Sequence, residues 1–569
     1  MINLKRSSGL PCIQFVLLFW HWLSVVKNEA ATSAAAAAAS AETERQFIWF
    51  SDIHLDPYYG TDRATQYSAY NDDQECGAGK KVTHPYGDYG CDAPPLLVES
   101  LIQRAAARYC GTTSDNNNNN NSTTSKVDFV MITGDFTRHH NDELLPNPLN
   151  ATEDIIRTVS QTLTASFPAN LPILPNLGNN DVTPDYYLDY NNPSEMLNMA
   201  FRGFKPLFVA SAFGENATTT FVRGGYYAYQ LEEAPSGLTI LSLNTVLYAT
   251  NHIPNNNDND KPDDPLGQFA WLEEELVQAT QEQRSVYIIG HIPPSIGSYR
   301  HTQLWQEQYL ETYYTIVDAY KKVVKAQLFG HIHSDEFRIH RHVFPMYLTS
   351  SFTPIYGSNP SFRVVTYDSE TMALLDYTTE YLDLDVATAT AYQNTMESNN
   401  NGNATTTQTY VLEENAHYWK QGQSFTKAFQ VPDMSLRSLE TIVHDLQMST
   451  DDSVYWEALL TRWHVYTHGS EVCDIVCRRE WVCTLTSVTA EQYQTCVMEL
   501  WLEEDALAIF GVVLVVLLSV FVVGYLGCRY GPQCDCRRRH SYEVPSDHHD
   551  GFGPIENRPG GEQQLLEIT

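Results

Sequence analysis

The stretch at residues 127–135 reads VDFVMITGD, an apolar run that ends in glycine and aspartate. Runs of the same kind lie at 47–52, 238–244, 285–291 and 326–331, and each of them also ends in a polar side chain. Short apolar runs bounded by polar residues are typical of buried strands. An amphipathic stretch at 269–276 predicts a helix between two of these strands. Strands and helices therefore alternate, which predicts an α/β fold around a covered sheet.

Side chains that bind metal ions collect where these strands end. They are Asp52, His54, Asp135, Asn179, His291, His331 and His333. Oxygen and imidazole ligands of this kind suit Zn²⁺, Mn²⁺ and Fe. If the backbone stays extended, residues two apart share one face, so the pair at 52 and 54 and the pair at 331 and 333 would each direct two ligands into one cleft. Glycines beside several of these ligands would let the backbone turn sharply.

Five ordered motifs surround these side chains. They read SDIHLDPYY (51–59), TGDFTRH (133–139), LGNND (177–181), GHIPP (290–294) and FGHIHSDEF (329–337). Together they resemble the motifs of the calcineurin-like metallophosphoesterases, and within them the acid sphingomyelinase family. The resemblance extends from about Phe47 to Asp368 and again through the C-terminal cysteines. It implies a β-sandwich flanked by helices.

The resemblance also implies two divalent metal ions, which are zinc in that family. One ion would be held by Asp52, His54, Asp135 and His333, and the other by Asp135, Asn179, His291 and His331, with Asp135 bridging. Two cations about 4 Å apart neutralise a phosphodiester, lower the pKa of a bridging water and hold both oxygens for in-line displacement. The chain is therefore expected to be a metal-dependent phosphodiesterase.

Two further residues are candidates for catalysis. His139 matches the proton-donating histidine of the family, although the neighbouring His140 is an alternative and a solvated loop position is another. Where much of the family has GNH, this chain has Asn180. An amide can donate a hydrogen bond to a phosphoryl oxygen but cannot transfer a proton.

The motifs leave other functions open. GNND together with TGDFTRHHND resembles the endopolyphosphatases, which cut phosphoanhydride chains. No saposin-like module precedes the catalytic region, which favours the acid sphingomyelinase-like phosphodiesterases and soluble substrates such as nucleotides over sphingomyelin. Asn180 also raises the alternative of a metal-binding receptor without turnover.

The charge of the chain limits its partners. The formal net charge is −34, so we expect no nucleic-acid-binding surface. An anionic phosphoester substrate, such as a lipid headgroup, a nucleotide or polyphosphate, would need local positive charge, which bound metal ions can supply.

Two apolar segments predict the topology. Lys5 and Arg6 precede the run 10–26, as in a signal peptide. The run 506–527 is uncharged and long enough to cross about 30 Å of hydrocarbon, with acidic residues before it and arginines after it. We expect a type I membrane protein whose catalytic domain is extracellular or in the lumen of a lysosome or vacuole. The expected parts are a signal peptide (1–29), a low-complexity linker (30–45), the catalytic domain (46–395), an Asn/Thr-rich linker (396–410), a helical Cys-rich subdomain (411–500), the membrane helix (506–527) and a cytoplasmic tail (528–569).

The cysteines and sequons agree with export. An oxidising compartment predicts disulfides. The resemblance implies the pairs Cys76 with Cys91, Cys473 with Cys477, and Cys483 with Cys496, which leaves Cys110 over. Glycosylation sequons lie at Asn121, Asn150, Asn216 and Asn403. The aromatic stretch 455–463 has the spacing of a core helix.

Overall fold

The computed structural model describes residues 43–64, 76–77, 80–111, 127–144, 146–231, 237–254, 261–340, 344–391, 416–449, 453–467, 473–500 and 515–522. The chain divides into two units, Met1–Trp501 and Leu502–Thr569. The predicted signal peptide, the linker at 396–410 and the cytoplasmic tail lie outside the described residues.

Among the described residues, twelve strands form the centre of the first unit. They are β1 (Glu44–Phe50), β2 (Val127–Ile132), β3 (Ile173–Pro175), β4 (Tyr227–Leu231), β5 (Leu238–Ser242), β6 (Ser285–Ile289), β7 (Val324–Phe329), β8 (Glu336–His340), β9 (Phe344–Leu348), β10 (Ser361–Asp368), β11 (Leu374–Leu382) and β12 (Trp419–Gln421). One sheet has the order β12-β11-β10-β1-β2-β3 and the other the order β4-β5-β6-β7-β9-β8. Strands β1, β2 and β3 run parallel, as do β5, β6 and β7. The five strands predicted from the apolar runs are confirmed.

The two sheets pack face to face. Successive side chains of a strand point to opposite faces. On β1, Phe47 and Trp49 enter the core shared with the second sheet, where Phe47 stacks on Phe129 with 4.8 Å between ring centroids. Ile48 and Phe50 enter the core beneath the helices. Both faces of the strand are buried, which explains why its sequence is continuously apolar.

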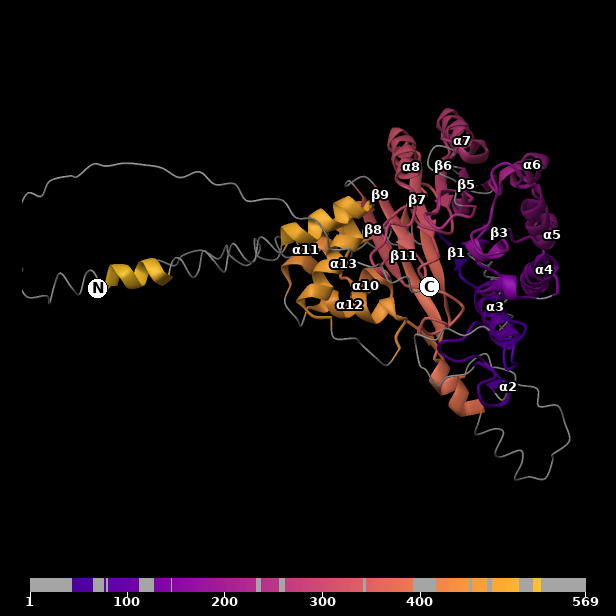
Figure 1. Cartoon of the computed structure of the whole chain (residues 1–569), viewed down its shortest axis with the longest axis horizontal. Coiled ribbons are helices and arrows are strands. Elements are labelled where there is room, and N and C mark those ends of the chain that lie inside the picture. Colours follow the sequence, from indigo (N-terminus) through magenta and orange to yellow (C-terminus); the bar gives the residue numbers. More distant parts are fainter. Residues whose placement is uncertain are drawn as a thin grey trace, which may run out of the picture. The chain divides into compact units, whose positions relative to one another are not determined.

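Helices flank this sandwich, as predicted. They are α3 (Pro95–Cys110), α4 (Pro148–Ser166), α5 (Ser194–Ala210), α6 (Glu215–Gly224), α7 (Gln268–Glu282) and α8 (Glu307–Ala319), together with the short α2 (Lys80–Thr83) and the 3-10 turns at Asn141–Glu143, Asn179–Asp181, Thr245–Tyr248 and Pro265–Gly267. The predicted helix at 269–276 lies within α7, which buries Phe269, Leu272 and Leu276 at helical spacing. In Figure 1, α3 to α6 lie on one side of the sheets.

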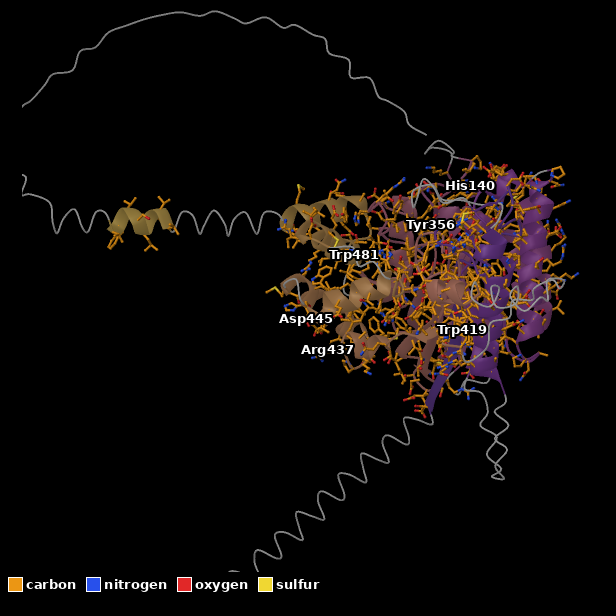
Figure 2. The ribbon with its side chains drawn as sticks, turned by 90° about the horizontal axis from the view of Figure 1, so that it is seen from below. His140, Tyr356, Trp419, Arg437, Asp445 and Trp481 are labelled. Carbon is orange, nitrogen blue, oxygen red and sulfur yellow. A yellow bond between two sulfur atoms is a disulfide. The ribbon has the colours of Figure 1, made fainter. Side chains whose placement is uncertain are left out.

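A group of helices near the C-terminus covers the opposite side (Figure 1). They are α10 (Phe425–Ala428), α11 (Leu436–Met448), α12 (Val454–Trp463) and α13 (Ile475–Thr486), and we call them the helical subdomain. The predicted core helix is confirmed as α12, because Trp456 and Leu459 are buried. In Figure 2, Arg437 and Trp481 mark this subdomain, and Trp419 marks β12.

Two strands differ from the domain organisation that the sequence predicts. Glu44 begins β1 inside the expected linker, since its pairing with Asp368 continues the ladder to β10. The region expected to be helical contains β12, which pairs with β11. Without β12, β11 would be an edge strand with unpaired backbone groups.

The disulfides Cys76–Cys91, Cys473–Cys477 and Cys483–Cys496 are present. Cys110, at the end of α3, takes part in none of them.

The second unit is described only at residues 515–522, which are helical and exposed. Within the described parts of the chain, no helix has the length and hydropathy needed to cross a bilayer. The other residues of the predicted membrane segment 506–527 lie outside the described residues.

Candidate metal centre

All seven predicted metal ligands lie in loops or short turns that follow parallel strands. Asp52 and His54 follow β1, Asp135 follows β2 and Asn179 follows β3 in one sheet, while His291 follows β6 and the pair His331 and His333 follows β7 in the other. The carboxyl ends of parallel strands lie at the same edge of a sheet. The ligand-bearing edges of the two sheets lie next to each other. The structure therefore brings together ligands that are far apart in sequence.

The condition that the backbone stays extended at the two ligand pairs is not met. The φ angles are 49° at Asp52, 43° at His54, 70° at His331 and 59° at His333, all in the left-handed region. Each pair lies beyond the end of its strand, where the chain curls instead of continuing the pleat. This conformation costs roughly 1–2 kcal/mol per residue and needs support from its surroundings. Hydrogen bonds from the His54 amide to the Asp135 carbonyl (3.0 Å) and from the His331 amide to Asp52 Oδ1 (3.0 Å) provide it.

Glycines permit the close approach of these loops. A Cβ atom on Gly178 would lie 2.1 Å from Asp135 Oδ1, which is an impossible contact. Gly134 has a φ of 91°, and a Cβ atom there would lie 2.7 Å from His291 Nδ1. The glycines next to Asp135 and Asn179 thus allow two ligand loops to touch.

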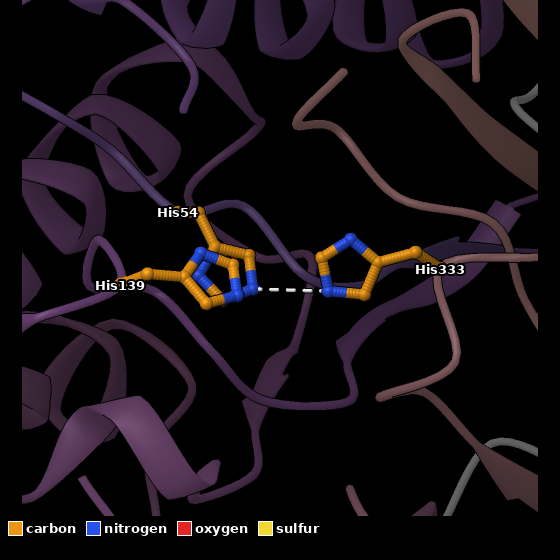
Figure 3. A group of neighbouring side chains, drawn as sticks. All are labelled: His54, His139 and His333. Carbon is orange, nitrogen blue, oxygen red and sulfur yellow. Dashed lines mark hydrogen bonds between the residues drawn. The ribbon is translucent and has the colours of Figure 1, made fainter. Parts of the chain in front are cut away.

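The ligand atoms form two adjoining groups around Asp135. In the first, His54 Nε2 lies 3.2 Å from His333 Nε2 (Figure 3) and 3.4 Å from Asp135 Oδ2. His333 Nε2 is 3.3 Å from Asp52 Oδ1. In the second group, His291 Nε2 lies 3.0 Å from Asp135 Oδ2 and 2.9 Å from Asn179 Oδ1. His331 has a ligand atom within 4.8 Å of both His291 and Asp135.

The protonation pattern of these groups fits bound cations. His54 Nδ1 lies 3.0 Å from the carbonyl of Thr137, and His291 Nδ1 lies 2.7 Å from the carbonyl of Thr133. A carbonyl only accepts, so both Nδ1 atoms carry the proton. In the neutral ring, Nε2 then presents a lone pair to the oxygens of Asp135. Lone pairs that face one another across such distances are stabilised by a positive charge between them, which either a proton or a metal ion can supply.

The pKa shifts show which of these rings are neutral and which one attracts a proton. Burial lowers the pKa of His54 and of His331 to about 3, which keeps both rings neutral, as metal ligands must be. Burial also opposes charge on His291, but the Asp135 carboxylate outweighs it and raises the pKa of His291 to about 9. The position beside Asp135 therefore attracts positive charge strongly.

Two carboxylates that the sequence reasoning missed, the buried Asp181 and the partly buried Asp185, support the predicted ligands. Asp181 accepts hydrogen bonds from four backbone amides, those of Asp135, Phe136, Thr137 and Gly178, at 2.8 to 3.2 Å. Asp185 accepts a hydrogen bond of 2.8 Å from Asn179 Nδ2, which turns Asn179 Oδ1 toward His291. Asp181 is the last residue of the GNND motif, so the sequence could have identified it as a site residue. No local motif identifies Asp185.

His139 lies against the first group of ligands. Its ring stacks on His54 with 4.0 Å between centroids (Figure 3). Its Nε2 atom is 3.2 Å from the Tyr356 hydroxyl, and its Nδ1 atom is 3.0 Å from Asp92 Oδ1. Burial disfavours the imidazolium form, but Asp92 outweighs it and raises the pKa of His139. The alternative, His140, is exposed.

Asn180 contacts the central carboxylate. Its side-chain amide donates to Asp135 Oδ2 at 2.9 Å, and its backbone amide donates to Asp135 Oδ1 at 2.8 Å. The expected contact between Asn180 and a phosphoryl oxygen stays a prediction.

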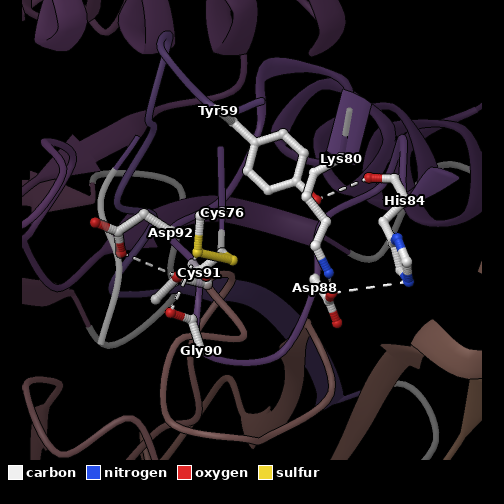
Figure 4. The surroundings of a disulfide bond; sticks show 9 residues. Tyr59, Cys76, Lys80, His84, Asp88, Gly90, Cys91 and Asp92 are labelled. Carbon is white, nitrogen blue, oxygen red and sulfur yellow. Dashed lines mark hydrogen bonds and ion pairs between the residues drawn. A yellow bond between two sulfur atoms is a disulfide. The ribbon is translucent and has the colours of Figure 1, made fainter. Parts of the chain in front are cut away.

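The Cys76–Cys91 disulfide supports the loop that carries Asp92 (Figure 4). In the same loop Asp88 pairs with Lys80, and the Tyr59 hydroxyl donates to the His84 carbonyl at 3.0 Å. Asp92 directly follows Cys91 in sequence, so the disulfide restrains its position.

A cavity of about 470 Å³ adjoins the metal centre. Its lining includes Tyr186, Tyr299, Arg300, His331, Tyr356 and Trp463. Aromatic faces and one guanidinium group therefore lie beside a predicted metal ligand, with Trp463 coming from the helical subdomain.

The sequence is similar to one protein family and to several proteins that are named as phosphodiesterases. Residues 46–335 match the family described as calcineurin-like phosphoesterase. The protein named sphingomyelinase phosphodiesterase D from Dictyostelium discoideum is 35% identical over 323 residues, which cover 55% of this chain and 65% of that protein. Human acid sphingomyelinase-like phosphodiesterase 3b is 28% identical, with 81% of this chain and 92% of that protein covered. The mouse cyclic GMP-AMP phosphodiesterase SMPDL3A is 29% identical, with 80% and 92% covered.

Proposed function

The chain belongs to the calcineurin-like phosphoesterase family, and from this premise we propose that it is a phosphodiesterase that uses two divalent metal ions. The observation that carries the proposal is the convergence of histidine Nε2 atoms on Oδ2 of Asp135, at 3.4 Å from His54 and 3.0 Å from His291. The relatives named above are phosphodiesterases by name, which agrees with this chemistry.

The two groups of ligand atoms suggest how the ions are held. One ion is assigned to Asp52, His54, Asp135 and His333, and the other to Asp135, Asn179, His291 and His331. We propose zinc, since imidazole nitrogen dominates the ligand set. Such ions supply charge neutralisation and an activated water at the phosphorus atom.

His139 is proposed as the general acid for the leaving group. Asp92 holds its Nδ1 proton and raises its pKa, so the imidazolium form persists to higher pH. The Nε2 atom is the one available to donate a proton, and it lies beside the Tyr356 hydroxyl. A histidine so placed contributes about 10²–10⁴-fold to such reactions.

The cavity supports a substrate with a bulky group on one side of the phosphate. Tyr299 and Trp463 offer apolar faces, and Arg300 offers a positive charge. We propose a nucleotide-type phosphodiester for this cavity, because aromatic rings can stack on a base and Arg300 can pair with an anionic group.

The compartment is also a proposal. The three disulfides and the exposed side chains of Asn150 and Asn216 are compatible with an exported catalytic unit. Asn121 and Asn403 lie outside the described residues. We propose that the segment 506–527 anchors this unit to a membrane, with the catalytic side facing the exterior or a lysosomal or vacuolar lumen. A glycosidase-sensitive mass shift that becomes smaller in the double variant Asn150→Gln/Asn216→Gln would support export.

The function is tested by turnover on a panel of sphingomyelin, a cyclic dinucleotide, ATP and long-chain polyphosphate, at acidic and neutral pH. The proposal expects hydrolysis of a phosphodiester, loss of activity after chelation and recovery with zinc. Turnover of polyphosphate alone would establish the endopolyphosphatase alternative. Metal binding without turnover of any substrate would establish the receptor alternative.

A further inference from the structure

The segment from His331 to Asp335 carries two predicted metal ligands and is held at both ends. At its start, the Gly330 amide donates to the His291 carbonyl (3.0 Å), and the His331 amide donates to Asp52 Oδ1 (3.0 Å). At its end lies the buried carboxylate of Asp335, two residues after His333. Between these points His331 and His333 have left-handed backbone, so the segment depends on its two anchors.

The anchor at Asp335 consists of four donors. Oδ1 accepts from Arg363 Nη2 (2.5 Å) and from the Tyr377 hydroxyl (2.6 Å). Oδ2 accepts from Arg462 Nη2 (3.1 Å) and from the Thr379 hydroxyl (3.0 Å). Arg363, Tyr377 and Thr379 stand on β10 and β11 of the sandwich. Arg462 is the donor that the helical subdomain supplies.

Arg462 is fixed on its own side as well. It lies near the end of α12, its side chain is 2% exposed, and Nη1 donates to the Gln423 carbonyl at 2.7 Å. The guanidinium groups of Arg363 and Arg462 both lie against the Tyr377 ring, at 4.2 and 4.8 Å from its centroid. The next residue, Trp463, lines the cavity that also includes His331. One end of α12 thus meets both the ligand segment and the substrate cavity.

We propose that Arg462 is a positioning residue through which the helical subdomain holds His331 and His333 in place for metal binding. The inference rests on the proposed metal centre, but it does not depend on which substrate is cleaved. Groups that orient metal ligands from outside typically change metal affinity 10- to 100-fold when removed. The helical subdomain would therefore contribute to metal retention in addition to global stability.

The charges around Asp335 make the inference testable. Two guanidinium groups share one carboxylate, so Arg462→Met leaves Asp335 paired with Arg363 and leaves no isolated buried charge. Methionine also retains much of the apolar stem. We therefore expect the variant to fold.

The chain offers a matched control. Glu380 is also buried and also has two guanidinium partners, Arg104 at 3.3 Å and Arg108 at 2.9 Å, and a tyrosine donor, Tyr109 at 2.7 Å. All three partners stand on α3. Arg104→Met removes one of two guanidinium groups from a buried carboxylate, as Arg462→Met does, but at a site whose partners are not on the helical subdomain.

The experiment measures zinc affinity by chelator competition on the full-length chain in detergent, with circular dichroism to verify folding. We expect Arg462→Met to bind zinc 10- to 100-fold more weakly than the wild-type chain, Arg462→Lys to lie between them, and Arg104→Met to bind as the wild type does. Unchanged affinity in folded Arg462→Met would overturn the inference, and so would an equal loss in Arg104→Met. A wild-type chain that binds zinc but cleaves no substrate would contradict the proposed enzyme and leave this inference standing, whereas one that binds no zinc would remove both.

Discussion

The Nδ1 atom of His139 lies 3.0 Å from Oδ1 of Asp92, and the backbone amide of His139 donates to the other oxygen of the same carboxylate at 2.9 Å. Asp92 is fully buried and follows the disulfide-bonded Cys91. A single carboxylate therefore fixes both the position and the tautomer of the proposed general acid.

The variant Asp92→Asn tests this pairing through pH. Asp92 raises the pKa of His139, so in the wild-type chain the protonated, active form is present below that pKa and is lost as the pH rises through it. Without the negative charge the pKa falls, and the alkaline limb of the pH–rate profile should move to lower pH. The measurement is kcat against pH at saturating zinc. An unmoved alkaline limb would show that another group supplies the proton.

The variant His139→Ala tests the role of general acid itself. We expect kcat to fall by about 10²–10⁴-fold on a substrate with a poor leaving group and far less on a p-nitrophenyl ester, whose leaving group needs no proton. His140→Ala is the control, because the neighbouring side chain is exposed and should leave both rates unchanged. Equal losses on the two substrates would argue that His139 acts in some other way.

The variant Asp185→Ala tests how Asn179 is oriented. Asp185 accepts from Asn179 Nδ2, so without it the amide can turn its nitrogen toward the ligand position. Zinc affinity should fall by about 10- to 100-fold. Calorimetric titration with zinc measures this directly. Wild-type affinity in the variant would mean that His291 alone orients the amide.

The disulfides predict an order of stabilities. Cys76 and Cys91 are 15 positions apart in sequence, and Cys473 and Cys477 are 4 positions apart. Chain-entropy arguments give about 3 kcal/mol for the first and about 2 kcal/mol for the second. Urea unfolding of the two double alanine variants should therefore show the larger loss of unfolding free energy for Cys76→Ala/Cys91→Ala. A reversed order would indicate strain or denatured-state effects that outweigh loop length.

The strands and the positions of the candidate ligands could be predicted because both have local signals. An apolar run that ends in a polar side chain identifies a buried strand and its carboxyl end, and so it located Asp52, Asp135 and His291 correctly at one edge of the sandwich. The left-handed backbone at His331 has no such signal, because it is supported by hydrogen bonds to distant residues such as Asp52, whose carboxylate accepts from the His331 amide.

The supporting residues were missed for a related reason. Asp92 meets His139 across 47 positions of sequence, and Arg462 meets Asp335 across 127. Periodicity reports which face of an element is buried, but it does not report which buried polar groups pair between elements. Those pairs depend on how the loops and α12 pack against one another in the folded chain.

We propose that seven side chains hold a pair of metal ions around Asp135. Elemental analysis of the purified full-length chain, after saturation with zinc and removal of unbound metal, tests it most directly. We predict two zinc ions per chain for the wild type and, because the bridging carboxylate is lost, close to none for Asp135→Asn. A wild-type chain that retains no zinc, or an Asp135→Asn chain that retains two ions, would contradict it.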